Sequence, residues 1–360
     1  MKIAIKKIDL EYSANAVSKA LTNKLEGKMG VITLCAENDA LNVATGNGEI
    51  VISSNVQAEV IESGKVNVAG KLFCEAIKKI TDEEIEMYLD KELYIRCADG
   101  FVKIPALDGS IDWTDYKQPT STSEIKLAIS EFKNIVKRSI AFCSTDDSRP
   151  LLKGVNIKTV GDVLTAVALD GYRLAKSETK ISASNKDINV IVPASALNCI
   201  CSILGNDGDI ALQVSDKDKL LQVKTKDTTF TAVLLQGEFV SYDRIIPTNF
   251  TTQVKAPKKE MLSALERASM FGETYSVADF EIAPDSVEIK SKGASGEAYS
   301  KVKATADGKD LEIAFNAKYF IGVLKLLAGD MVDMCFNKQN EPTIIKEAGA
   351  TFLLLPIRRN

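Results

Sequence analysis

The residues best placed to do chemistry in this chain lie in one short segment, from Ser148 to Ala175. Within it, the aliphatic runs Leu151–Ile157 and Val163–Leu169 flank the turn signal Thr159–Asp162, which predicts a hairpin. Asp170-Gly171 is a second tight-turn signal, and Tyr172, Arg173 and Leu174 follow directly. Glycine adopts backbone conformations that other residues resist, so a turn is expected here. The turn would project an aromatic ring, a cation and an aliphatic side chain from one rigid point. On pattern alone, a plain hairpin with a satisfied arginine is the alternative.

Catalytic chemistry has little support elsewhere. The chain has no histidine, which removes Ser-His and Cys-His nucleophiles and histidine metal ligands. It contains no GxxxxGK phosphate loop, and Gly293–Gly296 lacks the strand–helix setting of a dinucleotide fingerprint. The acidic clusters Asp82–Glu84 and Asp146-Asp147 could provide ligands for magnesium-dependent phosphodiester hydrolysis. Because the first is expected at a helix end and the second in a polar loop, the favoured interpretation is that both are solvated surface residues. We expect no catalytic residue, metal or cofactor, and a nuclease is a weak alternative.

Length and composition describe a globular protein of two or three domains. The 360 residues are 45% hydrophobic and 26% charged, and no apolar run approaches the roughly 18 residues of a membrane span. The charged N-terminus lacks a signal-peptide core. Seven cysteines without metal-ligand spacing predict free thiols in a reducing cytoplasm. A net charge of −4 means that any contact with DNA would need a local basic surface.

The chain repeats itself at a period near 120–125 residues. Strand-into-helix units begin at Val66, Ile188 and Leu311. When Phe73, Leu197 and Phe320 are aligned as equivalent positions, successive units are 124 and 123 residues apart. Two further sets of strands follow in the same order after each unit. Three sets of similar segments that recur in the same order and at the same spacing predict three copies of one domain.

Each copy also opens with a short strand and an amphipathic helix, expected over 9–24, 131–143 and 258–271. The fold class is therefore α+β: three similar β-rich domains, each with two helices on one side of its sheet. Polar, turn-rich stretches at Lys117–Glu124 and Pro247–Thr252 separate them. The expected domains are residues 1–120, 121–247 and 248–360.

Two segments carry a family resemblance. SRPLLKG followed by LTAVALDGYRLA, and the C-terminal TFLLLPIRRN, resemble the bacterial sliding clamp, the β subunit of replicative DNA polymerase. The resemblance implies a head-to-tail dimeric ring that encircles duplex DNA, tethers polymerase and other replication or repair proteins through short linear motifs, and is loaded by a separate ATP-driven loader. A ring-forming paralogue that recruits no polymerase is the alternative. The first domain lacks the family's proline-rich stretch after Leu25, which fits a divergent or accessory member.

The family's peptide-binding pocket can be carried over residue by residue. Val240 stands where the family commonly has proline, and Tyr172 where it often has histidine, so both reshape the pocket. The resemblance implies that this pocket binds a peptide of five or six residues with a glutamine and terminal aliphatic or aromatic residues. Apolar members of the pocket would anchor the peptide, and Arg173, Arg244 and Arg358 would receive its polar groups at the rim. The matching positions are Leu169, Gly171, Tyr172, Arg173, Leu174, Val240, Arg244, Ile245, Leu353, Leu355, Pro356, Ile357 and Arg358.

Contacts with DNA and with a second chain are also expected. Five of the six equivalent helices are basic, and helices turned inward around a hole would meet duplex phosphates without reading sequence; the lysine-free helix 193–204 departs from this pattern. Phe101, Met270 and Phe271 match the family's dimer interface. The expected DNA-facing residues are Lys19, Lys24, Lys71, Lys78, Lys133, Lys137, Arg138, Arg149, Lys258 and Lys318.

Overall fold

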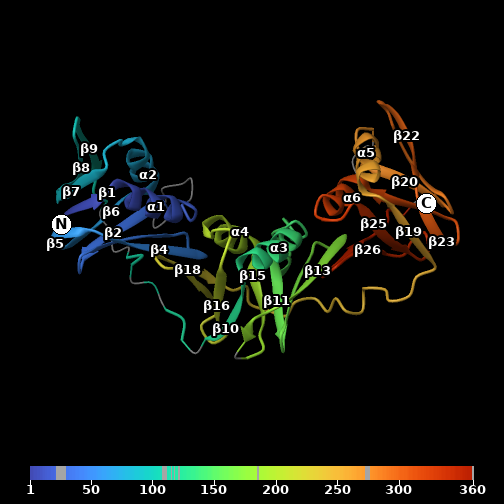
Figure 1. Cartoon of the computed structure of the whole chain (residues 1–360), viewed down its shortest axis with the longest axis horizontal. Coiled ribbons are helices and arrows are strands. Elements are labelled where there is room, and N and C mark those ends of the chain that lie inside the picture. The colour runs from blue at the N-terminus through green and yellow to red at the C-terminus, as the bar shows by residue number, and fades with distance from the viewer. Residues whose placement is uncertain are drawn as a thin grey trace. The chain divides into compact units, whose positions relative to one another are not determined.

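The computed structural model describes residues 1–21, 30–107, 112–114, 116, 118–120, 122–184, 186–271 and 276–358 (Figure 1). Its contacts divide the chain into two compact units. Unit 1 contains Met1–Phe132 and Ile181–Leu235, and unit 2 contains Lys133–Lys180 and Gln236–Asn360. The domain boundaries near residues 120 and 247 stay a prediction. No helix in the described ranges is long and apolar enough to cross a membrane.

Unit 1 is built on two antiparallel sheets. The five-stranded sheet has the order β5-β1-β7-β8-β9 and the nine-stranded sheet the order β14-β10-β16-β17-β18-β4-β3-β2-β6. The elements are β1 (Lys2–Lys6), α1 (Lys7–Ser18), β2 (Val31–Glu37), β3 (Ala40–Gly46), β4 (Ile50–Gln57), β5 (Glu59–Glu62), β6 (Gly64–Ala69), α2 (Gly70–Lys79), β7 (Glu84–Asp90), β8 (Glu92–Cys97), β9 (Gly100–Pro105), β10 (Ser123–Ala128), β14 (Ala183–Ser184), β15 (Asn189–Pro193), α4 (Ala194–Ile203), β16 (Asp209–Ser215), β17 (Leu220–Lys224) and β18 (Thr228–Val233).

Unit 2 also has two antiparallel sheets. One runs β11-β12-β13-β27-β26-β25-β19-β23, and a four-stranded sheet runs β22-β21-β20-β24. The elements are α3 (Ile129–Ile140, mostly in this unit), a 3₁₀ helix (Pro150–Lys153), β11 (Gly154–Val160), β12 (Val163–Leu169), β13 (Arg173–Lys180), β19 (Thr252–Pro257), α5 (Lys258–Ala268), β20 (Val277–Ala283), β21 (Ser286–Gly293), β22 (Gly296–Lys303), β23 (Thr305–Gly308), β24 (Leu311–Asn316), α6 (Ala317–Leu324), β25 (Met331–Phe336), β26 (Thr343–Glu347) and β27 (Ala350–Leu354).

Each of the six α-helices in the described part of the chain starts directly at the end of a strand. The pairs are β1–α1, β10–α3, β19–α5, β6–α2, β15–α4 and β24–α6. Within the units, α1 packs against α2 and β4, and α5 packs against α6, β21 and β22 (Figure 1). The buried side of α5 shows the helical spacing that this packing requires, since Met261, Ala264, Leu265 and Ala268 are all buried. The predicted sheet-rich α+β fold with these repeated strand-into-helix units is confirmed.

The structure corrects several predicted boundaries. Helix α1 runs from Lys7 to Ser18 rather than over 9–24, and Lys24 lies outside the described residues. Helices α3 and α5 each end three residues earlier than predicted, at Ile140 and Ala268. The strand expected from Leu151 begins only at Gly154. Pro150 instead opens a 3₁₀ helix, because its ring fixes φ and removes a sheet donor.

One glycine fixes the end of β23. Gly308 has a φ of +122°, and a Cβ there would lie 2.0 Å from the carbonyl oxygen of Thr251. Gly308→Ala should therefore lower the thermal midpoint by several degrees, because both the backbone conformation and the space exclude a side chain. Gly161→Ala is the matched control, since Gly161 has a φ of +60° with nothing within 4 Å of its added Cβ. Equal midpoints for the two variants, measured by circular dichroism, would contradict the steric part of this explanation.

Candidate functional site

A row of apolar side chains crosses five adjacent strands of unit 2. Leu169 on β12 pairs with Leu174 on β13, Leu174 with Leu353 on β27, Leu353 with Ile344 on β26, and Ile344 with Cys335 on β25. Paired residues in antiparallel strands point to the same face, so the five side chains form one continuous stripe. We call this stripe and its neighbours the unit 2 cluster; the other members are Leu152, Val167 and Tyr242, with half-buried Phe239, Ile246 and Phe250 packed against them.

The unit 2 cluster is bordered by apolar side chains that remain exposed. Tyr172, Val240, Ile245 and Leu355 are between 40% and 58% accessible. Two of them are joined by the backbone, because the Leu355 N–H donates to the Tyr172 carbonyl oxygen at 2.9 Å. Further along the tail, the Ile357 N–H donates to the Ala314 carbonyl oxygen at 2.7 Å. The structure therefore brings residues of all three predicted segments to one apolar surface within unit 2.

The Asp170-Gly171 turn is held by its own aspartate. Asp170 Oδ1 accepts from the N–H groups of Tyr172 and Arg173, at 2.9 and 3.1 Å. Gly171 has a φ of +96°, where a side chain would be strained, and a Cβ there would lie 2.8 Å from Arg149 Nη1. The predicted turn is confirmed, and the guanidinium of Arg149 lies beside it.

The three predicted rim arginines differ in their surroundings. Arg244 and Arg358 are exposed, whereas the Arg173 side chain is only 18% accessible. Its Nε donates to Asp170 Oδ2 at 2.9 Å, and its guanidinium lies over the rings of Phe142 and Tyr319. Arg173 is thus placed behind the turn rather than at the open rim, because it points to the opposite side of β13 from Leu174.

The sequence of the chain matches a known protein family along most of its length. Three family models cover most of the chain: the N-terminal, central and C-terminal domains of the DNA polymerase III beta subunit match residues 1–110, 126–241 and 243–356. The chain belongs to the bacterial sliding-clamp family.

Relatives of this clamp align over almost the whole chain. The beta sliding clamp of Synechocystis is 25% identical over 99% of both chains. That of Staphylococcus aureus strain Mu50 is 27% identical, over 93% of this chain and 90% of the relative. The DNA polymerase sliding clamp structure from Bacillus subtilis matches with a TM-score of 0.95 at 25% identity, over 100% of both chains. The Thermotoga maritima beta subunit matches with a TM-score of 0.92 at 23% identity, over 100% of both chains.

Sequence reasoning missed two aromatic members of the clamp's site. Phe142 follows α3 and is fully buried, and Tyr319 lies on α6 with its ring 6.4 Å from that of Tyr172. The only available signal was the position of Tyr319 in the third strand-into-helix unit, one residue after Lys318. Asn316 caps α6 there, since its Oδ1 accepts from the Lys318 and Tyr319 N–H groups.

The predicted DNA-facing residues of the clamp fall into two groups. Some are committed to contacts within unit 2: Arg138 donates to Glu347 at 2.6 Å, Arg149 to Asp146 at 3.1 Å, and Lys258 Nζ to the Leu327 carbonyl oxygen at 3.1 Å. The Arg138 and Glu347 side chains are only 14% and 15% accessible, so Arg138 is not presented to a ligand. Lys133 is half-buried. The exposed members are Lys19, Lys71, Lys78, Lys137, Lys318 and, despite its contact with Asp146, Arg149.

Two of the three predicted interface residues, Phe101 and Phe271, lie at the outermost strand of a sheet in the described ranges. Phe101 is 63% accessible on β9, the edge strand of the five-stranded sheet. Met270 is 71% accessible just after α5. Phe271 is half-buried and its ring lies against Gly296, the first residue of the edge strand β22.

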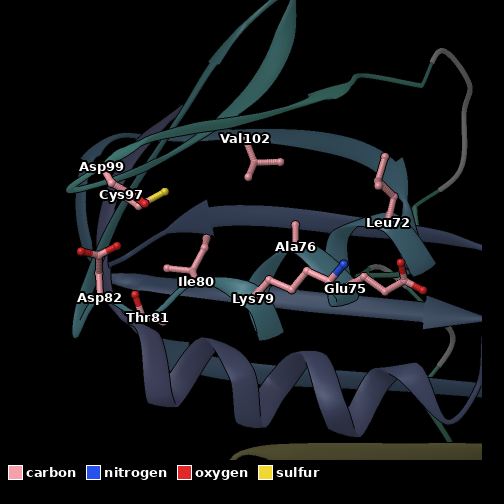
Figure 2. A pocket seen from close by; sticks show the side chains of 10 residues that line it. All are labelled: Leu72, Glu75, Ala76, Lys79, Ile80, Thr81, Asp82, Cys97, Asp99 and Val102. Carbon is pink, nitrogen blue, oxygen red and sulfur yellow. The ribbon is translucent and has the colours of Figure 1, made fainter.

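A separate cavity of about 300 Å³ lies in unit 1 between α2 and the β8–β9 hairpin. Figure 2 shows Asp82, Cys97 and Asp99 together at one end and Leu72 at the other. Potential ligand atoms of those three residues lie within 4.8 Å of one another. Burial raises the pKa of the Cys97 thiol, which disfavours the thiolate that would bind a metal. Of the acidic cluster Asp82–Glu84, only Asp82 lines the cavity.

Proposed function

We propose that two copies of this clamp form a ring around duplex DNA, and that the ring tethers a DNA polymerase and other replication or repair proteins through the unit 2 cluster. The observation that carries the proposal is the apolar row across five strands with an exposed apolar border. Such a surface suits a short peptide that becomes ordered on binding, because a few apolar anchors must offset its lost conformational entropy.

The peptide would bring aliphatic or aromatic side chains to the exposed border of the cluster. Exposed Val240, Ile245 and Leu355 supply aliphatic contacts, and the exposed ring of Tyr172 supplies an aromatic one. Arg244 and Arg358 are accessible to its carbonyl or carboxylate oxygens. Clamp-loader subunits and polymerases that carry such motifs would compete for this surface.

The ring would close head to tail. The edge strand β9 with Phe101 belongs to unit 1, and the edge strand β22, next to Phe271, belongs to unit 2. Two different surfaces that complement each other generate a closed ring when the rotation between copies allows it. An exposed edge with an exposed aromatic side chain is the expected place for such a contact.

Sliding clamps are non-catalytic processivity factors, and we assign no bond-making step to this chain. Exposed lysines such as Lys19, Lys71 and Lys318 would meet DNA phosphates weakly and without sequence preference. Opening of the ring would depend on a separate ATP-driven loader. All seven cysteines are free thiols, which fits a place of action in the reducing cytoplasm.

Retention on DNA should be topological. After loading, the clamp should stay on nicked circular duplex through gel filtration and should leave within minutes once the circle is cut. The reason is that exposed lysines give only salt-sensitive contacts, whereas a closed ring cannot leave a circle. The measurement compares clamp in the DNA peak before and after cutting. Retention on the linear product at moderate salt, or release from the intact circle, would contradict the ring.

A further inference from the structure

The side of the turn that faces away from the unit 2 cluster holds a compact charged group. We propose that Asp170 and Arg173 form a latch that fixes the turn against α6, and that Arg173 is a positioning residue for peptide binding and not a ligand of the peptide. The inference rests on the proposed function, because it assigns a role at that same surface.

The environment of Arg173 supports this assignment. Its guanidinium carbon is 4.5 Å from the ring centroid of Tyr319 and 5.1 Å from that of Phe142, so the cation lies close to two aromatic rings. Its Nε donates to Asp170, and the two side chains are only 18% and 12% accessible. Cation–π contacts and a charge-assisted hydrogen bond gain strength where water is largely excluded. Arg173 therefore has little freedom to reach a peptide.

The latch connects elements that are distant in sequence. Phe142 follows α3, Asp170 and Arg173 flank the turn, and Tyr319 lies on α6. The helix passes close by, since a Cβ at Gly322 would lie 3.6 Å from Arg173 Nη1. Arg173 thereby contacts both α6 and the turn, and the exposed ring of Tyr172 lies 6.4 Å from the half-buried ring of Tyr319.

The C-terminal tail depends on the same turn. The Leu355 N–H donates to the Tyr172 carbonyl oxygen, which lies in the peptide unit directly before Arg173. A turn that moves would therefore carry the Tyr172 ring and the tail with it. Both belong to the border of the unit 2 cluster, so loss of the latch would disturb the binding surface without removing any anchor.

The charge balance behind the turn comes from this pair. Arginine carries a positive charge at all relevant pH values, and the Asp170 carboxyl group is its hydrogen-bonded acidic partner. The neighbouring Cys143 thiol contributes no charge, because burial raises its pKa to about 12. Removing one partner would leave the other charge poorly compensated, and the turn would lose its fixed position.

The test uses the full-length clamp and a fluorescein-labelled pentapeptide that begins with glutamine and ends with leucine and phenylalanine. The peptide is made with aspartate or asparagine at its third position, and binding is followed by anisotropy. Asp170→Asn keeps an oxygen for the two turn N–H groups but replaces the carboxylate Oδ2, which accepts from Arg173 Nε, with an NH2 donor, whereas Arg173→Gln removes the cation. We expect each single variant to bind both peptides roughly tenfold more weakly than the parent. The double variant should also bind roughly tenfold more weakly, because the effects of two substitutions on the affinity do not add when both remove the same interaction.

Arg138→Gln is the matched control, because Arg138 and Glu347 form an equally buried pair in unit 2. It should lower the thermal midpoint and leave peptide affinity within about twofold of the parent. The latch is overturned if Arg138→Gln weakens binding as much, if Arg173→Gln affects mainly the aspartate peptide, or if neither latch variant changes affinity. A parent clamp that fails to bind either peptide contradicts the proposed function instead.

Discussion

Removal of the last five residues, from position 356 onward, should weaken peptide binding by roughly thirtyfold or more while the ring stays closed. The truncation deletes Pro356, Ile357 and Arg358 and the hydrogen bond from the Ile357 N–H to Ala314. It leaves β27 intact, since that strand ends at Leu354. The loss of a buried interfacial anchor typically costs about 2 kcal/mol, which corresponds to the stated factor.

Substitutions of single side chains distinguish the residues that would contact the peptide from the residues that stabilise unit 2. Leu355→Ala and Ile357→Ala should each weaken the peptide by roughly tenfold to thirtyfold with little change in thermal midpoint, because neither side chain is fully buried. Leu174→Ala should also weaken binding, but Leu174 is 1% accessible, so it should lower stability as well by about 2–5 kcal/mol. Val160→Ala is the control, since Val160 is an exposed aliphatic residue at the opposite end of the β11–β12 hairpin.

Titration with a labelled polymerase-tail peptide measures these effects, and analytical gel filtration checks the ring. Parent-like affinity in the truncation and in both single variants would place the binding surface elsewhere. A truncation that loses the ring along with the peptide would mean that the tail supports assembly rather than recognition.

Met270→Asp should convert the proposed dimer to monomers at micromolar concentration and abolish retention of the clamp on circular DNA. Met270 is 71% accessible, so a buried position in the dimer would explain why an apolar side chain stands there. A charge enclosed in an apolar contact without a partner costs several kcal/mol, and two such contacts open the ring. Phe101→Asp should have the same result from the other surface.

Ile61→Asp is the control for this prediction. Ile61 is also exposed, on β5, which forms the opposite edge of the sheet that contains β9. The Ile61→Asp variant should sediment as a dimer in sedimentation-velocity runs at the same concentration. A dimer in both Met270→Asp and Phe101→Asp would reject the assigned surfaces, and a monomer in Ile61→Asp would show that any charge on this sheet disrupts assembly.

Local sequence signals predicted the elements well. The runs on either side of Thr159–Asp162 form β11 and β12, and the glycine of Asp170-Gly171 has the positive φ that its turn requires. Each helix was found from its apolar spacing and from its position after a strand. These features depend on a few neighbouring residues, and so they can be read along the chain.

The side-chain partners of the site could not be predicted in the same way. The row from Leu169 to Cys335 depends on the register of β13 against β27, which no local pattern specifies. The direction of Arg173 depends on Phe142, from the segment after α3, and on Tyr319, from α6, and both are remote in sequence. From the sequence, Arg138 could not be distinguished from the other basic residues on the helices. Its ion pair is with Glu347, which is remote in sequence.

The pairing of β4 with β18 has a consequence for synthesis of the chain. Ser54 lies opposite Thr228, and their hydroxyl groups hydrogen-bond across a separation of 174 residues. During translation, β4 must therefore wait with an unpaired edge until the ribosome has made β18. Contacts closed over such distances form slowly, and an unpaired edge is open to other strands meanwhile. The interval between the synthesis of β4 and that of β18 is thus the stage at which a chaperone would be needed most.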